Sequence, residues 1–118
     1  MKRVLVADDS SFMRMVIKGI LEKNGFEVVA EAENGNEAVE KYIKFKPDIV
    51  TLDITMPQKN GIEALKSIKG YDPEAKVVMV SAIGQEVYIK EAQNLGAQSY
   101  IVKPFVEEQV IQTLNKLL

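Results

Sequence analysis

"VLVADDSS", residues 4–11, joins a run of aliphatic side chains to two adjacent carboxylates and two hydroxyls. An aliphatic run of this kind is typical of a strand buried on both faces of a parallel sheet. Asp and Ser are common where a strand ends and a helix begins, because they cap free backbone N–H groups. One acid is enough for that structural role. The second is unexpected, since Asp8 and Asp9 repel each other unless a cation lies between them.

The pattern of the first strand is repeated along the chain, where five short β-branched runs alternate with five segments of helical periodicity. The predicted strands are 3–7, 27–31, 48–52, 76–80 and 99–102. This alternation predicts an α/β fold, a doubly wound parallel sheet of five strands with right-handed crossovers and helices on both faces. The 118 residues fit one domain, residues 1–118, and 47% of them are hydrophobic, which is enough for a core.

Helix boundaries also follow from the sequence. Asn24 and Gly25 form a stop signal for the first helix, and Asn34 precedes Glu37 by three residues, a loose capping box for the second. The third helix is predicted near 61–69, ending at Gly70 and Pro73. The fourth is predicted at about 85–95, and the last begins after residue 104.

The composition excludes several classes of function. There is no Cys and no His, which excludes disulfides, thiolate zinc sites, thiol nucleophiles and Ser-His pairs. Fifteen basic and seventeen acidic side chains, without a basic stripe, argue against nucleic acid as a partner. No apolar run approaches the ~18 residues of a membrane span, and the acids at 8 and 9 interrupt the hydrophobic start that a signal peptide needs. We expect a cytoplasmic protein that does not bind membranes.

Polar side chains follow four of the predicted strands. Asp8 and Asp9 follow the first strand, Asp53 the third, Ser81 the fourth and Lys103 the fifth. Each alone has an ordinary reading as a loop cap, a locally bonded hydroxyl or a solvated amine. Together they indicate one pocket, because sites in doubly wound sheets form outside the carboxyl ends of the strands.

The charges of this pocket indicate its chemistry. Two carboxylates roughly 4–5 Å apart repel by about 3–4 kcal/mol at an effective dielectric near 20, so three ionised Asp need a cation. Oxygen ligands without His or Cys favour Mg²⁺ over zinc. Mg²⁺ beside a free carboxylate and an amine suits phosphoryl transfer, with Asp53 as the acceptor that forms an aspartyl phosphate.

These residues resemble the receiver domains of two-component response regulators, and within that family the single-domain chemotaxis regulators. The resemblance covers the whole chain and rests on four motifs in the family's order: "DDS" at 8–10, "DITMPQKNG" at 53–61, "SA" at 81–82 and "KPF" at 103–105. It implies a flavodoxin-like fold with strand order 2-1-3-4-5, which sets the first and third strands side by side.

The resemblance implies a role for each acid. Asp53 takes a phosphoryl group from a CheA-like histidine kinase. Asp9, Asp53 and the backbone carbonyl of Thr55 hold Mg²⁺, while Asp8 acts mostly through a metal-bound water. The chain is then a phospho-accepting signalling domain that assists its own phosphorylation and dephosphorylation, not an enzyme with separate substrates.

The resemblance also implies a switch. Lys103 pairs with Asp53 and later with the phosphoryl oxygens, and its peptide bond to Pro104 is cis. Ser81 moves toward the phosphate and Tyr100 follows it inward, which alters the surface of the fourth helix, fifth strand and fifth helix. Tyr100 has an equally ordinary reading as a half-buried aromatic of an edge strand.

The expected partner of that surface is a flagellar motor switch protein, bound by a monomer, with a phosphatase as a further partner. Ile83, two residues past Ser81, and Thr55 flank the path of attacking water in the family. Because Ile83 cannot orient a water, we expect autodephosphorylation to be slower than in relatives with polar residues at both positions. Gly61 is expected to serve backbone conformation, not chemistry.

Three other functions stay open. A sporulation-type phosphorelay intermediate shares the same receiver chemistry. A haloacid-dehalogenase-like phosphatase also uses an Asp nucleophile and Mg²⁺, but typically has a second Asp where this chain has Thr55. A flavodoxin-like flavin-binding module is disfavoured, because "DDSS" repels a phosphate without a metal and the chain has no Trp.

Overall fold

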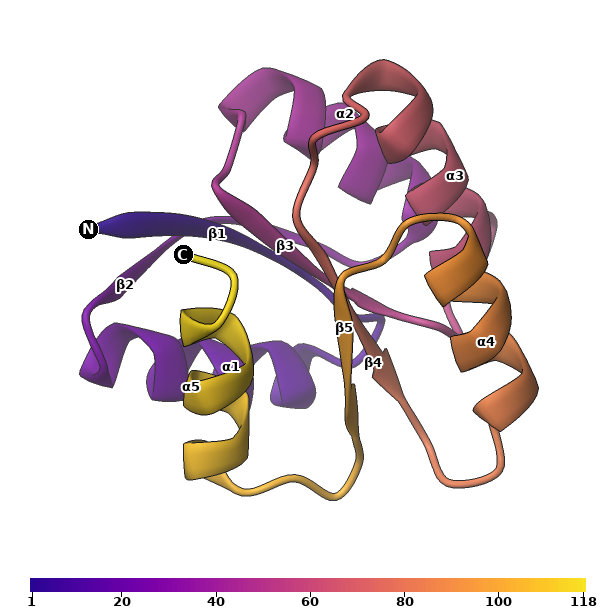
Figure 1. The fold of residues 1–118 in the computed structure, drawn as a ribbon. Helices are drawn as coiled ribbons and strands as arrows, with labels where there is room; N and C mark the ends of the chain where they lie inside the picture. The colour runs from indigo at the N-terminus through magenta and orange to yellow at the C-terminus, as the bar shows by residue number, and fades with distance from the viewer.

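The computed structural model describes residues 1–118 as five strands and five helices in strict alternation (Figure 1). The strands are β1 (Lys2–Ala7), β2 (Phe26–Ala32), β3 (Ile49–Asp53), β4 (Val77–Ser81) and β5 (Ser99–Val102). The helices are α1 (Ser11–Lys23), α2 (Gly35–Phe45), α3 (Gly61–Tyr71), α4 (Glu86–Asn94) and α5 (Glu107–Asn115). All five predicted strands are confirmed, with ends displaced by at most one residue. None of the helices is both long enough and apolar enough to cross a bilayer.

The strands form one parallel sheet in the order β2-β1-β3-β4-β5, so the expected doubly wound order is confirmed. β1 and β3 are direct neighbours, and their register pairs Ala7 with Leu52. The next residue on each strand is an aspartate, Asp8 or Asp53. The register therefore brings these two acids together at the carboxyl edge of the sheet.

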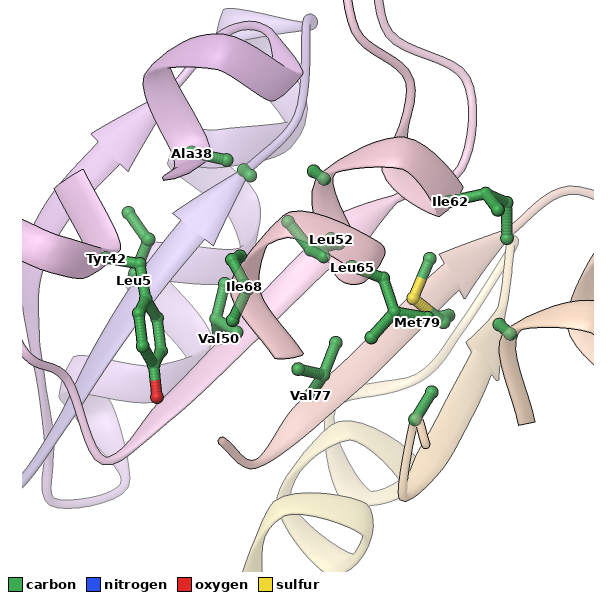
Figure 2. Packing of buried hydrophobic residues seen from close by; sticks show 14 of the residues in the cluster. Leu5, Ala38, Tyr42, Val50, Leu52, Ile62, Leu65, Ile68, Val77 and Met79 are labelled. Atoms are coloured by element: carbon green, nitrogen blue, oxygen red, sulfur yellow. The ribbon is translucent and has the colours of Figure 1, made fainter. Parts of the chain in front are cut away.

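Two layers of helices cover the sheet (Figure 1). On one face, α1 and α5 bury Ile17, Leu21, Val110 and Leu114 against the strands. On the other face, α2, α3 and α4 pack over Leu5, Val50, Leu52, Val77 and Met79, as Figure 2 shows for the first two helices. Since both faces are covered, Val4–Ala7 of β1 and all of β3 and β4 are buried, and nearly all of these residues are apolar.

Two details of the helix ends differ from the predictions. The Asn34 side chain accepts from the backbone N–H of Glu37, but the Glu37 carboxylate accepts from Glu33, so this capping box is incomplete. The complete box lies at the start of α3, between Asn60 and Glu63.

The observed end of α3 lies two residues beyond the predicted one. The helix continues through Gly70 and ends at Tyr71, because a glycine inside a helix costs only about 1 kcal/mol. The stop is set by Pro73, which disfavours helical backbone in the preceding residue, and Asp72 is extended.

Candidate phosphoacceptor and metal site

Three aspartates meet at the carboxyl edge of the sheet. Asp8 and Asp9 directly follow β1, and Asp53 is the last residue of β3. Asp8 and Asp53 are buried, with 1% and 7% of their surface exposed, whereas Asp9 is exposed. One carboxylate oxygen from each lies within 4.8 Å of the others. The structure therefore places all three acids where they can share one ion.

Lys103 supplies the positive charge of the pocket. Its Nζ donates to Asp8 Oδ2 at 3.1 Å and to Asp53 Oδ2 at 3.2 Å. The sequence led us to expect the contact with Asp53 but not the one with Asp8. The Lys103–Pro104 peptide bond is cis in the structure. One ammonium group thus serves two buried carboxylates, and the pocket retains a negative charge.

The acid–base properties of the pocket reflect this imbalance. Burial and the nearby Asp8 carboxylate raise the pKa of Asp53 from 3.8 to about 6, although Lys103 and the Thr55 N–H act in the opposite direction. Burial lowers the pKa of Lys103, but the attraction of both carboxylates outweighs it and the net pKa is raised. Lys103 therefore stays charged at neutral pH, and the Asp53 carboxylate is stabilised too little by its surroundings.

The donor set fits a hard divalent cation. The groups at this edge are carboxylate and carbonyl oxygens, and the chain has no His or Cys that would favour a softer metal. A divalent cation would also relieve the repulsion that raises the pKa of Asp53. Asp9, Asp53 and the backbone carbonyl of Thr55 are the residues that would hold it.

Ser81, the last residue of β4, is buried, and its Oγ has no hydrogen-bond partner. Its carbonyl accepts from the backbone N–H of Lys103, which ties β4 to the residue after β5. Buried hydroxyls are nearly always bonded, so an orphan at the edge of the acidic pocket marks a group able to take a new partner.

Tyr100 lies on β5 and does not join the acidic pocket. It is 43% exposed and lines a groove of about 520 Å³ between α4 and β5. Its partner in the register is Met79, two residues before Ser81 on β4. Ser81 and Tyr100 thus lie on one pair of neighbouring strands.

Sequence reasoning missed two residues that hold the loops of the site. Arg14 on α1 donates from Nη1 to the carbonyl oxygen of Asp8 at 2.7 Å and from Nε to Glu31 Oε1 at 3.1 Å. Gln85 bridges the loops that follow β3 and β4. An arginine one turn into the helix after Asp8 was a weak signal, and nothing in the local sequence marked Gln85.

Comparisons with known proteins agree with this geometry. The family model of the response regulator receiver domain matches residues 4–115. The chemotaxis proteins CheY of Bacillus subtilis (strain 168) and Thermotoga maritima are 56% and 55% identical to this chain, each over 116 residues that cover 98% of this chain and 97% of the relative.

A solved structure agrees as well. A chain of the CheX–CheY–BeF₃–Mg²⁺ complex from Borrelia burgdorferi superposes with a TM-score of 0.94 at 40% identity, covering 98% of this chain and 88% of that one. The match extends over nearly the whole chain and includes the strand ends that carry the acids, the hydroxyl and the amine. The chain therefore belongs to the family of response regulator receiver domains.

Proposed function

We propose that the chain is a chemotaxis response regulator that accepts a phosphoryl group on Asp53 from a CheA-like histidine kinase. The observation that carries this proposal is the convergence of Asp8, Asp9, Asp53 and Lys103 on one pocket. Two relatives named as chemotaxis proteins match this chain over 97% of their own length, which supports a role in chemotaxis.

Asp53 is the group best placed to act as the nucleophile. It is held between Lys103 and the Thr55 N–H at the end of a rigid strand, which fixes the direction of its carboxylate. An Asp53 oxygen forms the new O–P bond while the N–P bond of a phosphohistidine donor breaks. The electron pair of that bond stays on the imidazole nitrogen, which takes up a proton from solvent.

The other residues stabilise the charge that moves. Lys103 is cationic and contacts the Asp53 oxygen, so it can follow the charge onto the phosphoryl oxygens. Mg²⁺, when bound, neutralises charge on the phosphoryl group and orients it for in-line transfer. Asp8 holds Lys103 in place from the other side of the pocket. In this arrangement positioning and charge neutralisation supply most of the catalysis.

Phosphorylation then reaches the partner surface through Ser81 and Tyr100. The orphan Ser81 hydroxyl can donate to a phosphoryl oxygen, and Tyr100, on the neighbouring strand, then moves inward. This changes the groove between α4 and β5, whose mixed apolar and charged lining suits a short amphipathic helix. We propose a flagellar motor switch protein as the partner there.

A phosphatase is a second proposed partner. The solved complex from Borrelia burgdorferi joins a CheY to CheX with BeF₃ and Mg²⁺ present, so a similar fold binds a second protein in that state. Phe12 and Ile83 lie within three residues of Asp9 and Ser81 in the sequence, and both side chains are exposed. They offer apolar contacts for such a protein. The chain itself acts as a monomer in this proposal.

Labelling with acetyl phosphate in Mg²⁺, followed by intact-mass measurement, tests the acceptor. The wild type should gain one phosphoryl group and Asp53→Asn none, whereas Asp48→Asn, which changes an aspartate outside the pocket, should label like the wild type. Equal labelling of Asp53→Asn would overturn the assignment. A pull-down with a motor switch protein, with and without beryllofluoride, tests the output.

A further inference from the structure

Gln85 joins two loops of the site through the two ends of its carboxamide. Its Oε1 accepts from the backbone N–H of Ala82 at 2.6 Å, and its Nε2 donates to Thr55 Oγ1 at 2.9 Å. The orientation of the carboxamide is fixed, because the Ala82 N–H can only donate. We call this pair of hydrogen bonds the Gln85 bridge.

Both anchors of the Gln85 bridge lie next to reacting groups. Thr55 is two residues past Asp53, and its backbone N–H donates to Asp53 Oδ1 at 3.4 Å. Ala82 directly follows Ser81, whose buried hydroxyl has no partner. Two donors therefore stand side by side at the end of β4. One is free, and the other is occupied by Gln85.

The local chain conformation allows this closure. Gly84 has a φ of +93°, a conformation that other residues rarely adopt, and the turn it makes lets the Gln85 side chain fold back onto Ala82. Gln85 is also the residue before α4, yet its side chain caps no N–H of that helix. Both polar groups of the Gln85 side chain therefore bond to the two loops, and only its backbone carbonyl bonds to the helix.

A phosphoryl group on Asp53 competes for the same donor. It brings several strongly accepting oxygens to the carboxyl edge, where charge-assisted hydrogen bonds are about twice as strong as those to a neutral carboxamide. For the loop after β4 to move toward that group, the Ala82 N–H has to leave Gln85. The bridge thus stabilises the unphosphorylated arrangement and opposes the change.

We infer that Gln85 is a positioning residue that shifts the equilibrium of the phosphorylation switch toward the unphosphorylated state, because it holds the Ala82 N–H in that state. The inference rests on the proposed function, because it assigns regulation to the Asp53 site. A ligand shifts an equilibrium between two conformations only as far as its affinities for them differ. A substitution that destabilises the unphosphorylated conformation therefore raises the apparent affinity for a ligand that binds the phosphorylated one.

The test is the affinity for beryllofluoride, a phosphoryl mimic, at saturating Mg²⁺. Gln85→Leu keeps the size of the side chain and removes both hydrogen bonds. Since one net hydrogen bond corresponds to roughly a two- to tenfold change in an equilibrium constant, Gln85→Leu should bind beryllofluoride roughly two- to tenfold more tightly. Gln109→Leu, the same substitution at an exposed position of α5, should bind like the wild type.

A second readout separates the bridge from a general change in packing. The amide NMR signals of Ala82 and of the residues around Thr55 should shift in free Gln85→Leu, whereas those of α1 and α5, on the opposite face of the sheet, should match the wild type. Gln85→Ala serves as a second variant if Gln85→Leu folds poorly. Unchanged or weaker beryllofluoride binding in a folded Gln85 variant overturns the inference.

The same experiment distinguishes this inference from the proposed function. Asp53→Asn is measured in parallel. If the wild type does not bind beryllofluoride, or Asp53→Asn binds it equally well, the proposed function itself is wrong. If the wild type binds, Asp53→Asn does not and the Gln85 variants bind like the wild type, only the role of Gln85 is refuted.

Discussion

Asp53 is the residue whose surroundings conflict most with its charge. It is 7% exposed, shares the ammonium of Lys103 with Asp8, and has its pKa raised to about 6. A buried carboxylate with too little compensation destabilises the fold, because its ionised form is better solvated in the unfolded chain. The site therefore holds unfavourable electrostatic energy that a bound cation would relieve.

Asp53→Asn is predicted to stabilise the metal-free protein at pH 7 by about 1–3 kcal/mol in the free energy of unfolding. The folded chain holds the Asp53 proton more tightly than the unfolded chain, since its pKa is about 6 against 3.8. The wild type should therefore gain stability, relative to the variant, as pH falls from above 6 toward 4. Urea unfolding in EDTA across that range measures the difference.

The contrary outcome is easily recognised. If the difference in the free energy of unfolding between wild type and Asp53→Asn does not depend on pH between 4 and 7, then the pKa of Asp53 is not raised in the folded chain. Asp48→Asn serves as the control, because Asp48 accepts a hydrogen bond from the backbone N–H of Arg3 outside the pocket.

Arg14 is predicted to position the aspartates of the pocket. Its largely buried guanidinium holds the Asp8 carbonyl and Glu31 together, so Arg14→Met should weaken Mg²⁺ binding several-fold and lower stability by about 1.5–3 kcal/mol. Arg14→Lys should lose less Mg²⁺ affinity and less stability than Arg14→Met. Isothermal titration with Mg²⁺ and urea unfolding measure both effects.

Lys18→Met is the matched control for Arg14. It removes the same charge from α1, but Lys18 is more exposed and lies 3.9 Å from Glu31. An Arg14→Met protein whose Mg²⁺ affinity equals that of Lys18→Met would show that Arg14 does not shape the site.

Ile83 is predicted to lengthen the life of the aspartyl phosphate. Its side chain is 77% exposed in the loop after β4 and carries no group that can orient water. Ile83→Glu should hydrolyse faster, by several-fold, in a time course of phosphate loss after rapid removal of acetyl phosphate. Val87→Glu, at a side chain that is 78% exposed on α4, makes the same charge change farther along the chain and should leave the lifetime as it is. A lifetime of Ile83→Glu equal to that of Val87→Glu would refute the prediction.

At the scale of elements, the loop between β3 and α3 carries the tightest backbone contact of the site. The sequence led us to expect that Gly61 serves backbone conformation. The structure gives a different reason, since its φ is not in the left-handed region and a Cβ there would stand 2.1 Å from the carbonyl oxygen of Asp53. Gly61 therefore permits a close approach of α3 to the end of β3.

Gly61→Ala is predicted to lower the free energy of unfolding by about 1–3 kcal/mol or more and to weaken Mg²⁺ binding, because backbone at Asp53 has to move. Gly19→Ala, in the middle of α1 with open space around the new methyl group, should instead stabilise by about 0.5–1 kcal/mol. Urea unfolding of the two variants side by side decides the matter. If the two substitutions change the free energy of unfolding equally, the backbone contact between residue 61 and Asp53 relaxes easily.

The elements themselves were the most predictable part of the molecule. Aliphatic runs followed by Asp or Ser marked the carboxyl ends of β1, β3 and β4 within one residue, since burial on both faces leaves little place for a charged side chain until the strand leaves the core. The end of α3 was less predictable, because Gly70 and Pro73 are both stop signals and only the proline decided the outcome.

The acids of the site were predictable for the same reason, but the partners that hold them were not. Strand ends in a parallel sheet share one edge, which brings Asp8, Asp53 and Lys103 together before any side chain is placed. Arg14 and Gln85 reach across loops by long side chains whose partners depend on rotamers. No local pattern in the sequence encodes such contacts.

At the scale of the whole molecule, the site is a property of the complete sheet. Its groups come from the ends of β1, β3, β4 and β5, and each helix layer fixes the strands from one face. Any ligand that binds this edge binds the folded chain and not the unfolded one, so binding energy at the site becomes folding energy of the molecule.

Mg²⁺ is therefore predicted to raise the thermal midpoint of the wild type. At a concentration 100 times its Kd it should add about 2.7 kcal/mol to the free energy of unfolding. Asp9→Asn and Asp53→Asn should lose most of this gain, since each removes a carboxylate from the cluster. Glu86→Gln, at an exposed acid of α4, should keep it. Scanning calorimetry in EDTA and in Mg²⁺, at matched ionic strength, measures the gain, and an undiminished gain in Asp9→Asn would place the ion elsewhere on the molecule.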